Sequence, residues 1–500
     1  GGGRSRGGRS DGDRRNEQAA EGEPDDESCA TCHEVSEPAP PGLQPVCAMP
    51  PPRTKFWAVG GDREVAVSDG LERRLTLTDA VSMVVGIILG SGIFMAPSAL
   101  ATVAPTPWAG ALMWLVGGLI AACGAMTYAE CGARLPHDGG FVVFFERAWS
   151  QRWAFVGGWA ALFITYPASL AGVSVVGAHY LGEAVPALAP HPTPCALAML
   201  TGAATLNLFG VRLGSLAQRL LTGTKVGAVV AVVLAALWMR PGDAAPLGAA
   251  AALPPATPGM WLAAFAVLMW TYDGWTDVTL VAGELRDPGR NLGRAVVLGL
   301  GMLVTVYVLV QVAVLTLLPA SVAAGADGVF AVAVRSALGP AAGQGLAWLV
   351  VVSTGGSVHG MLWVTSRLGY ALAERGAIPR TFARLSPRFG TPTRAVLGAY
   401  GLAAVYASAS TFTELVSFFS FAIWICYGAT AVALLRLRAA GVGEPLVWRA
   451  PGGVLPPAVL LLAASIMTSL QIAQNPGRCA LGVGLMGLAW LLQGTWRRSS

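Results

Sequence analysis

Long apolar stretches recur along the chain from Leu75 almost to its end, and they limit the possible folds more than any other feature. Each is about 17–25 residues long, the length that an α-helix needs to cross the roughly 30 Å hydrocarbon layer of a bilayer. We predict twelve membrane-spanning helices, approximately at 77–102, 107–130, 153–180, 195–210, 219–239, 260–283, 295–318, 344–371, 394–409, 412–436, 454–472 and 479–496.

Charged residues are scarce where the apolar stretches lie. Only 12% of all residues are charged, against about a quarter in a typical soluble domain. Residues 1–74 hold 10 basic and 14 acidic side chains out of 33 and 28 in the whole chain, so the rest is under a tenth charged. This composition excludes secreted disulfide scaffolds, nucleic-acid binders and ordinary soluble enzymes, and it leaves a polytopic protein embedded in the lipid bilayer.

The first 70 residues differ sharply from the rest, because they are rich in Gly, Arg, Ser, acidic residues and Pro. Such a composition cannot offset the cost of ordering the chain, so we predict a disordered tail at 1–70 and a membrane-embedded domain at 71–500. Cys29, Cys32 and His33 in the tail match the C-x-x-C-H pattern of haem attachment. Haem, zinc and a chance match are the alternatives; we favour chance and expect no cofactor.

Basic residues set the expected orientation in the membrane, because cytoplasmic loops are enriched in Lys and Arg. Only three arginines fall in the predicted outer loops: Arg240, Arg335 and Arg478. The predicted inner loops hold many more, including Arg134, Arg147, Arg152, Arg212, Arg219, Arg286, Arg290, Arg294, Arg375, Arg380, Arg384, Arg388, Arg394, Arg436 and Arg438. We therefore predict a multi-pass protein of the cell membrane with both termini in the cytoplasm.

Two of the predicted spans contain residues that interrupt a helix. The first carries Gly90, Ser91 and Gly92 between apolar residues, and the sixth carries Asp273 and Gly274. Glycine is unfavourable in a helix interior, and unwound backbone at membrane depth occurs only inside the protein or beside a cavity. Spans 1 and 6 lead the two halves of the chain, and paired breaks of this kind indicate a substrate site in an inverted-repeat transporter.

Close helix packing is the alternative explanation for the glycines, since glycine is common where membrane helices contact each other. An isolated acid such as Asp273 is costly at this depth and usually marks a functional site. The two breaks together therefore favour function. The N-terminus of the half-helix that a break creates is suited to bind an anion.

Lys225 is one of only two lysines, and the other, Lys55, lies in the tail. One interpretation is that its side chain extends back to the membrane interface. The other is a buried ammonium that links the broken first span to its neighbours, in the place that a coupling cation would occupy. The second interpretation predicts transport that does not need sodium.

Four motifs in order resemble the amino acid–polyamine–organocation superfamily. They are Gly-Ser-Gly-Ile-Phe at 90–94, the run from Tyr128 to Gly140, Glu-Leu-Arg-Asp-Pro-Gly-Arg-Asn at 284–291, and the run from Gly356 to Leu368. Within it, the chain is most similar over about 70–496 to the L-type amino acid transporters and their bacterial relatives. The resemblance implies an all-α LeuT-type 5+5 inverted repeat, with repeat 1 at about 75–240, repeat 2 at about 258–438 and two further helices at 454–496.

The resemblance also implies a substrate site. The amides of Ser91, Gly92 and Ile93 would bind a carboxylate, and carbonyls near Ile88, Trp270 and Asp273 would receive an α-ammonium. Trp270 matches an aromatic gate, and Lys225 matches the lysine of the fifth span. The residues implied in substrate binding are Ile88, Gly90, Ser91, Gly92, Ile93, Trp270, Tyr272, Asp273 and Gly274, and those implied in replacing a coupling cation are Lys225 and Ser357.

Three positions depart from the family pattern. Asp273 stands where eukaryotic L-type members have glycine, so it could reinforce ammonium binding, bind a proton or favour cationic substrates. His359 replaces a smaller polar residue, and we interpret it as a histidine hydrogen-bonded between helices. Cys195 lies near the cysteine that joins mammalian members to a heavy-chain glycoprotein, but it is displaced from the expected order, and we do not expect such a partner.

We therefore predict a sodium-independent transporter that exchanges small amino acids by alternating access. No catalytic triad, nucleotide loop or metal-ligand set is visible, so we predict no enzyme activity and no nucleic-acid partner. A proton-coupled symporter with Asp273 or Glu130 as the protonated acid is the alternative, and a transporter-like sensor is a weaker one. We interpret Glu130 and Glu284 as members of charge networks at the inner face.

Overall fold

The computed structural model describes residues 73–238, 253–326, 328–410, 412–443, 448–474 and 476–499. All of them belong to one compact unit, Phe56–Ser500. The predicted tail, with Cys29, Cys32 and His33, lies outside the described residues. The regular structure of the described part is helical, apart from one isolated bridge between Leu75 and Leu285.

Every predicted span coincides with a helix or with neighbouring helices. In the first half these are α1 (Leu77–Ile88) with α2 (Gly92–Ala101), α3 (Pro107–Arg134), α5 (Gln151–Ala160) with η1 (Ala161–Thr165) and α6 (Tyr166–Ala184), α7 (Pro192–Leu208) and α8 (Val211–Trp238). In the second half they are α9 (Pro258–Thr271) with η3 (Asp277–Glu284), α10 (Pro288–Leu317), α13 (Pro340–Glu374), α14 (Thr393–Ala409), α15 (Phe412–Ala439), α16 (Leu455–Gln474) and α17 (Pro476–Ser499).

Five further short helices lie in the connections between spans: α4 (Phe141–Ala148), η2 (Pro186–Leu188), α11 (Ala320–Gly325), α12 (Val329–Leu338) and η4 (Arg380–Ala383). By length and apolar composition, seven of the described helices could each cross a membrane, or eight if α1 and α2 form one bent span. Several others, such as α7 and α9, are too short to meet that criterion. The part of the chain that the structure describes is thus that of a helical polytopic membrane protein, while the count of twelve spans stays a prediction.

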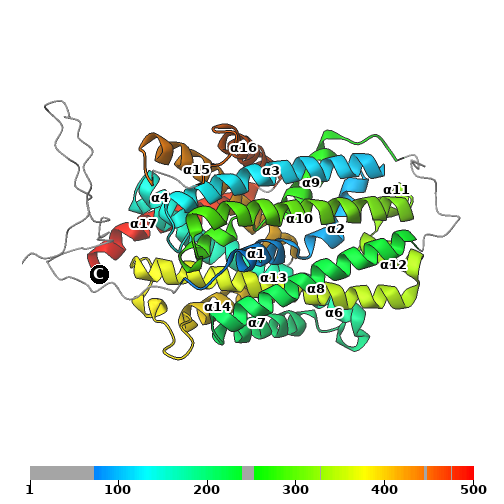
Figure 1. Ribbon diagram of the computed structural model, residues 1–500, viewed down its shortest axis with the longest axis horizontal. Coiled ribbons are helices and arrows are strands. Elements are labelled where there is room, and N and C mark those ends of the chain that lie inside the picture. Colours follow the sequence, from blue (N-terminus) through cyan, green and yellow to red (C-terminus); the bar gives the residue numbers. More distant parts are fainter. Residues whose placement is uncertain are drawn as a thin grey trace, which may run out of the picture. The chain divides into compact units, whose positions relative to one another are not determined.

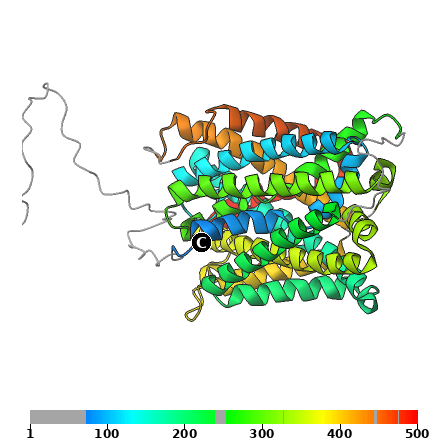
Figure 2. The same cartoon turned by 45° about the vertical axis from the view of Figure 1, so that its right-hand side comes forward.

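The bundle surrounds α1, which packs against α8, α10 and α13 (Figures 1 and 2). Beside it, α3 and α10 lie side by side along most of their length. Large apolar residues on the outer surface of α3, such as Leu112 and Leu119, remain exposed as expected for a surface that faces lipid. The broken helix α1–α2 therefore lies in the interior, where unwound backbone is tolerated.

The start of α1 is fixed by a capping box. The Thr76 side chain accepts from the Asp79 amide, and the Asp79 carboxylate accepts from the Thr76 amide at 2.8 Å. The same carboxylate forms an ion pair with Arg219 of α8 at 3.0 Å. One end of α1 is thereby anchored, and its other end leads into the first interruption.

Candidate functional site

The first break, residues 89–91, separates α1 from α2 at an angle of 51°. The regular hydrogen bonding of α1 ends at Gly90, whose amide donates to the carbonyl of Ile88, only two residues earlier, at 2.6 Å. Helix α2 then begins at Gly92 with Ser91 as its N-cap. The break therefore presents the C-terminus of one helix and the N-terminus of another at one point.

Lys225 of α8 lies beside this break and is completely buried. Its ammonium donates to the carbonyls of Gly86, Leu89 (2.8 Å) and Ser353 (3.1 Å) and to the Ser357 hydroxyl (3.1 Å). It thus joins the end of α1 to α13 and does not extend to an interface. An ammonium has three protons, so these four oxygens use its whole donor capacity.

Two serines of α13 support the same contact. The hydroxyl of Ser353 donates to the Leu89 carbonyl at 2.9 Å, and that of Ser357 donates to the Gly86 carbonyl at 2.9 Å. The Leu89 carbonyl therefore receives hydrogen bonds from both α8 and α13. These donors satisfy carbonyls that the end of α1 leaves without a partner in its own helix.

The second break, residues 272–276, separates α9 from η3. The Asp273 amide donates back to the Trp270 carbonyl at 3.1 Å, and Gly274 has a φ of 109°, which only glycine adopts without strain. Tyr272 is buried, and its hydroxyl donates to the Trp114 carbonyl of α3 at 2.8 Å, so its side chain is part of the packing against α3. Trp270 is half-buried.

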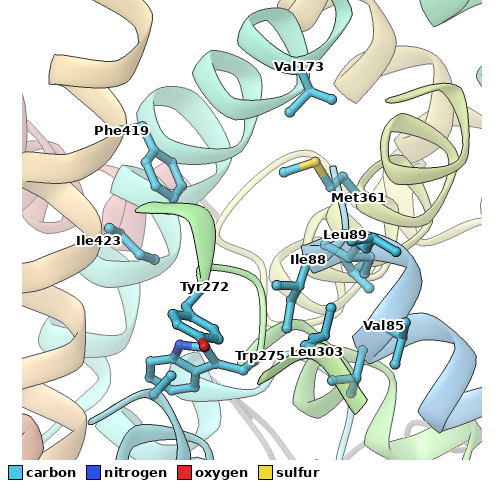
Figure 3. Packing of buried hydrophobic residues seen from close by; sticks show 14 of the residues in the cluster. Val85, Ile88, Leu89, Val173, Tyr272, Trp275, Leu303, Met361, Phe419 and Ile423 are labelled. Atoms are coloured by element: carbon cyan, nitrogen blue, oxygen red, sulfur yellow. The ribbon is translucent and has the colours of Figure 1, made fainter. Parts of the chain in front are cut away.

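The two breaks contact each other. A Cβ added to Gly92 would lie 3.0 Å from the Cα of Thr271, and one added to Gly274 would lie 2.9 Å from the Cγ2 of Ile87. Figure 3 shows apolar side chains gathered around this contact, among them Ile88, Val173 of α6 and Met361 of α13. The structure therefore brings the predicted residues of spans 1 and 6 into one site.

Tyr307 of α10 bridges the two broken helices. Its hydroxyl lies 3.1 Å from the carbonyl of Ile88 and 3.2 Å from that of Thr271, the last residues of α1 and α9. A phenol has one proton, so it cannot satisfy both carbonyls at once. Two helix C-termini, each with partial negative charge, thus converge on one donor.

The N-terminus of α2 supplies the opposite polarity. The Ser91 side chain is 1% exposed, and its Oγ has no hydrogen-bond partner. The first amides of a helix have no partner within that helix, and a buried hydroxyl without a partner costs about 1–3 kcal/mol. A bound carboxylate would accept from these donors, as anions do at helix N-termini.

Asp273 in the second break and Asp277, the first residue after it, have tyrosine partners from different helices. Tyr427 of α15 donates to Asp273, and Tyr166 of α6 donates to Asp277 at 2.8 Å. Among the described residues, neither acid forms an ion pair with a basic side chain. Burying a carboxylate without a cation is costly, so this region is suited to receive positive charge.

The other buried acids are paired. Glu130 forms ion pairs with Arg134 at 3.0 Å and Arg438 at 2.6 Å, and Glu284 pairs with Arg367 at 2.6 Å. The contacts of Glu130 join the end of α3 to the end of α15, and the contact of Glu284 joins the end of η3 to α13. Their geometry is that of charge networks between helix ends, as we expected from the sequence.

His359 and Cys195 lie away from the breaks. The ring of His359 contacts the Asn207 amide at 3.0 Å through Nδ1 and the Gly214 carbonyl at 3.2 Å through Nε2, so it joins α13 to α7 and α8. Cys195 is buried near the start of α7 with a free thiol. No group of three or more metal-ligating side chains occurs among the described residues.

Sequence reasoning missed several residues of this site. Tyr307, Tyr427, Tyr166 and Ser353 sit in apolar spans, where a single hydroxyl gives no periodic signal. Asp277 had a detectable signal, because an acid inside a predicted span is itself a mark of function. The structure places it directly after the second break, as the first residue of η3 and four residues beyond Asp273.

Comparison with known proteins agrees with this architecture. Residues 75–485 match the family model described as amino acid permease. The b(0,+)-type amino acid transporter 1 of Homo sapiens is 28% identical over 383 residues, 74% of this chain and 76% of that protein. The serine/threonine exchanger SteT of Bacillus subtilis is 26% identical over 433 residues, 85% and 96% of the two chains. The Asc-type amino acid transporter 1 of Mus musculus is 27% identical over 441 residues, 83% and 79% of the two chains.

Proposed function

Since the chain belongs to the amino acid permease family of the amino acid–polyamine–organocation superfamily, and so is an amino acid transporter and not an enzyme, we propose that it exchanges small amino acids. We further propose that exchange proceeds by alternating access in the cell membrane, without sodium and with both termini in the cytoplasm. The family match confirms the resemblance that the motifs indicated.

The contact between the two breaks carries the proposal. It sets donors at the start of α2, including the unpartnered Ser91 hydroxyl, beside the C-terminal carbonyls of α1 and α9. An amino acid is a zwitterion, so it needs an anion site and a cation site a short distance apart. Ser91, Gly92 and Ile93 would bind the carboxylate, while Ile88, Trp270 and Asp273 would receive the ammonium.

The surroundings of Lys225 support sodium independence. Carbonyl and hydroxyl oxygens of the kind that surround its ammonium are the ligands that hard cations prefer. The side-chain nitrogen of Lys225 lies at this position and contacts both α1 and α13, so it would supply the positive charge there. With Ser357 as a further contact, Lys225 would replace a transported cation permanently.

Small substrates and exchange are supported by the relatives and by the packing. The Bacillus relative is named as a serine/threonine exchanger. Apolar side chains near the breaks, including Met361, Phe419 and Ile423 (Figure 3), are buried and would limit the size of a substrate side chain. Half-buried Trp270 would cover the substrate. We do not propose a disulfide-linked heavy chain, because Cys195 is buried.

Proton-coupled symport is the second candidate, and Asp273 is the observation that favours it. Its carboxylate has a tyrosine partner and no basic one among the described residues, as expected for an acid that binds a proton. Glu130 suits that role less well, because two guanidinium groups stabilise its charged form.

Reconstitution in liposomes tests these proposals. Radiolabelled serine is supplied outside, with or without unlabelled serine inside, with sodium or choline, and with a pH gradient of either sign. Uptake that requires internal serine and ignores both ions is the expected result. Uptake into empty liposomes driven by inward protons would instead establish symport, and a strict sodium requirement would contradict the role given to Lys225.

A further inference from the structure

Three tryptophan rings form a row on the surface of the bundle. Trp149 directly follows α4, Trp153 lies in the first turn of α5, and Trp490 belongs to α17. The ring centroids are 6.0 Å apart between Trp149 and Trp153 and 5.4 Å apart between Trp153 and Trp490. Trp153 is 49% exposed and Trp490 is 39% exposed. Tryptophan is enriched where a membrane protein crosses the boundary between lipid and water, so the row marks such a boundary.

Two arginines lie over the ends of this row. The guanidinium carbon of Arg152 is 5.8 Å from the ring centroid of Trp490, and that of Arg436 is 5.5 Å from the ring centroid of Trp149. The helices that carry these side chains contact each other, α4 with α5 and α15, and α17 with α5 and α15. A guanidinium group that lies over an indole ring is held in place and still directs its N–H groups outward. The fold thus fixes two positive charges on one surface.

These two charges are not balanced by an acid of the described residues. Arg152 and Arg436 are exposed, and neither forms an ion pair with a described residue. Arg436 uses one of its five N–H groups on the Ala148 carbonyl, at 3.5 Å. The acid of α4, Glu146, pairs with Arg375 instead, at 3.4 Å. The surface therefore offers several charge-assisted donors to an anion from outside the protein.

Apolar surface borders the two arginines on α17. Leu488 and Leu491, which flank Trp490 in sequence, are 45% and 71% exposed. An anionic phospholipid combines the two features that this surface would match, a phosphate group at the lipid–water boundary and acyl chains beside it. The planar fork of a guanidinium group fits the oxygens of a phosphate. The N-terminus of α5 adds partial positive charge, because its N-cap Ser150 makes no side-chain capping bond.

We propose that Arg152 and Arg436, held over this row of tryptophans, bind the phosphate group of an anionic phospholipid. Figure 1 shows α4 and the C-terminal part of α17 at the same end of the bundle. We predict that this end faces the cytoplasm, and anionic lipids are concentrated in the cytoplasmic leaflet. The bound lipid would join α5 and α17 to α4 and α15. The inference goes beyond the proposed transport function, because the lipid site shares no residue with the two breaks.

Lipid titration of the purified protein in detergent, followed by native mass spectrometry, tests the proposal. The titration measures the affinity for phosphatidylglycerol, which is anionic, and for phosphatidylcholine, which has no net charge. We expect the wild type to bind phosphatidylglycerol roughly tenfold more tightly. In the double variant Arg152→Gln/Arg436→Gln, the affinity for phosphatidylglycerol should fall about thirtyfold, the size expected for two arginines at a membrane surface. The affinity for phosphatidylcholine should change little.

Arg380→Gln/Arg384→Gln is the matched control. Both arginines are exposed, at η4 and directly after it, and neither lies over an aromatic ring of a described residue. The control removes the same two charges and should bind phosphatidylglycerol as the wild type does. Trp490→Leu keeps every charge but removes the ring beneath Arg152. Its affinity for phosphatidylglycerol should fall about threefold, the size of an exposed cation–π contact.

Three results would overturn the lipid site. Equal losses of affinity in the two double variants would show that net charge alone attracts the lipid. Unchanged affinity in Arg152→Gln/Arg436→Gln would show that these arginines do not bind it. Inorganic phosphate that displaces phosphatidylglycerol and raises the thermal unfolding temperature as much would show an anion site that needs no lipid.

Thermal unfolding in detergent shows whether each variant is folded. If Arg152→Gln/Arg436→Gln does not unfold cooperatively, Trp490→Leu decides, and an unchanged affinity for phosphatidylglycerol in that variant would overturn the proposal. None of these measurements depends on serine exchange, so the lipid site and the proposed function can fail separately.

Discussion

The two breaks are held in place by opposite chemistry. At the first, residues 89–91, the ammonium of Lys225 and two serine hydroxyls donate to the end of α1, and a regular helix follows. At the second, residues 272–276, tyrosine hydroxyls donate to Asp273 in the break and to Asp277, the first residue of the 3₁₀-helix that follows. The first break is held by a lysine and contains no acid, while the second contains Asp273 and is followed by Asp277, and neither acid has a basic partner among the described residues.

This difference suggests a division of roles. A buried cation held by four oxygens is expensive to displace, so the first break is suited to remain unchanged and to present donors to a carboxylate. The second break contains Gly274 at a positive φ and leads into a 3₁₀-helix, whose hydrogen bonds are weaker than those of an α-helix. The acids there have no basic partner among the described residues, and a substrate ammonium would supply positive charge. Binding would therefore alter the second break more than the first.

Removal of the Lys225 ammonium should have the largest effect. Lys225→Met leaves the carbonyls of Gly86, Leu89 and Ser353 without this donor in the interior, and breaking a buried charged contact costs about 3–5 kcal/mol. We expect exchange in liposomes to fall by at least roughly a hundredfold and the thermal unfolding temperature to drop. Lys55→Met, at the only other lysine, is the control and should behave as wild type. Near-normal exchange in Lys225→Met would contradict the proposal that Lys225 supplies a fixed positive charge at the first break.

Neutralising the second break should have the next largest effect. Asp273→Asn keeps an oxygen for the Tyr427 hydroxyl but removes the negative charge that we propose faces the substrate ammonium. We expect the Km for serine to rise roughly thirtyfold, about 2 kcal/mol, with a smaller change in maximal rate. Tyr427→Phe, which keeps the charge, should raise the Km less. Equal effects of the two variants would show that the hydrogen bond matters and the charge does not.

Ser91 tests the anion side of the first break. Its buried hydroxyl has no partner in the structure, so Ser91→Ala should leave thermal stability unchanged or slightly raised. The Km for serine should nevertheless rise roughly fivefold, the size of a lost N-cap hydrogen bond. Ser353→Ala is the contrast, because its hydroxyl already donates to Leu89 and its loss should lower stability. A Ser91→Ala variant with unchanged Km would place the carboxylate elsewhere.

The sequence predicted those features of the site that depend on neighbouring residues, and it did not predict those that depend on residues far apart in the chain. The positions of the helices and both interruptions were predictable, because apolar length, glycine in mid-span and a rare lysine are local features of the chain. Tyr307, Tyr166 and Tyr427 were not, because a tyrosine in an apolar span has the same pattern whether it packs or bonds to a residue over a hundred positions away. The 3₁₀ form of η3 and the π-helical form of η1 depend on packing and not on local propensity.

The smallest expected effect concerns the far end of η3, where Asp138 holds the Gly283 amide. Burial, and then the negative charge of Glu284, raise the pKa of the Asp138 carboxyl above its ordinary value. From that ordinary value of about 3.9 up to the raised one, the folded protein binds more protons than the unfolded chain. The contribution of Asp138 to the free energy of unfolding therefore falls as pH rises through this window.

Asp138→Asn should remove this pH-dependent loss of stability, since its side-chain oxygen still accepts from the Gly283 amide and the side chain carries no charge to bury. We expect the variant and the wild type to unfold at similar temperatures at the acidic end of the window. Above it, the variant should be the more stable, by on the order of 1 kcal/mol. Thermal unfolding of both proteins in detergent across a pH series measures this difference. If the gap is already present at low pH and does not grow, the effect of Asp138 comes from packing, and charge does not limit how firmly this end of η3 is held.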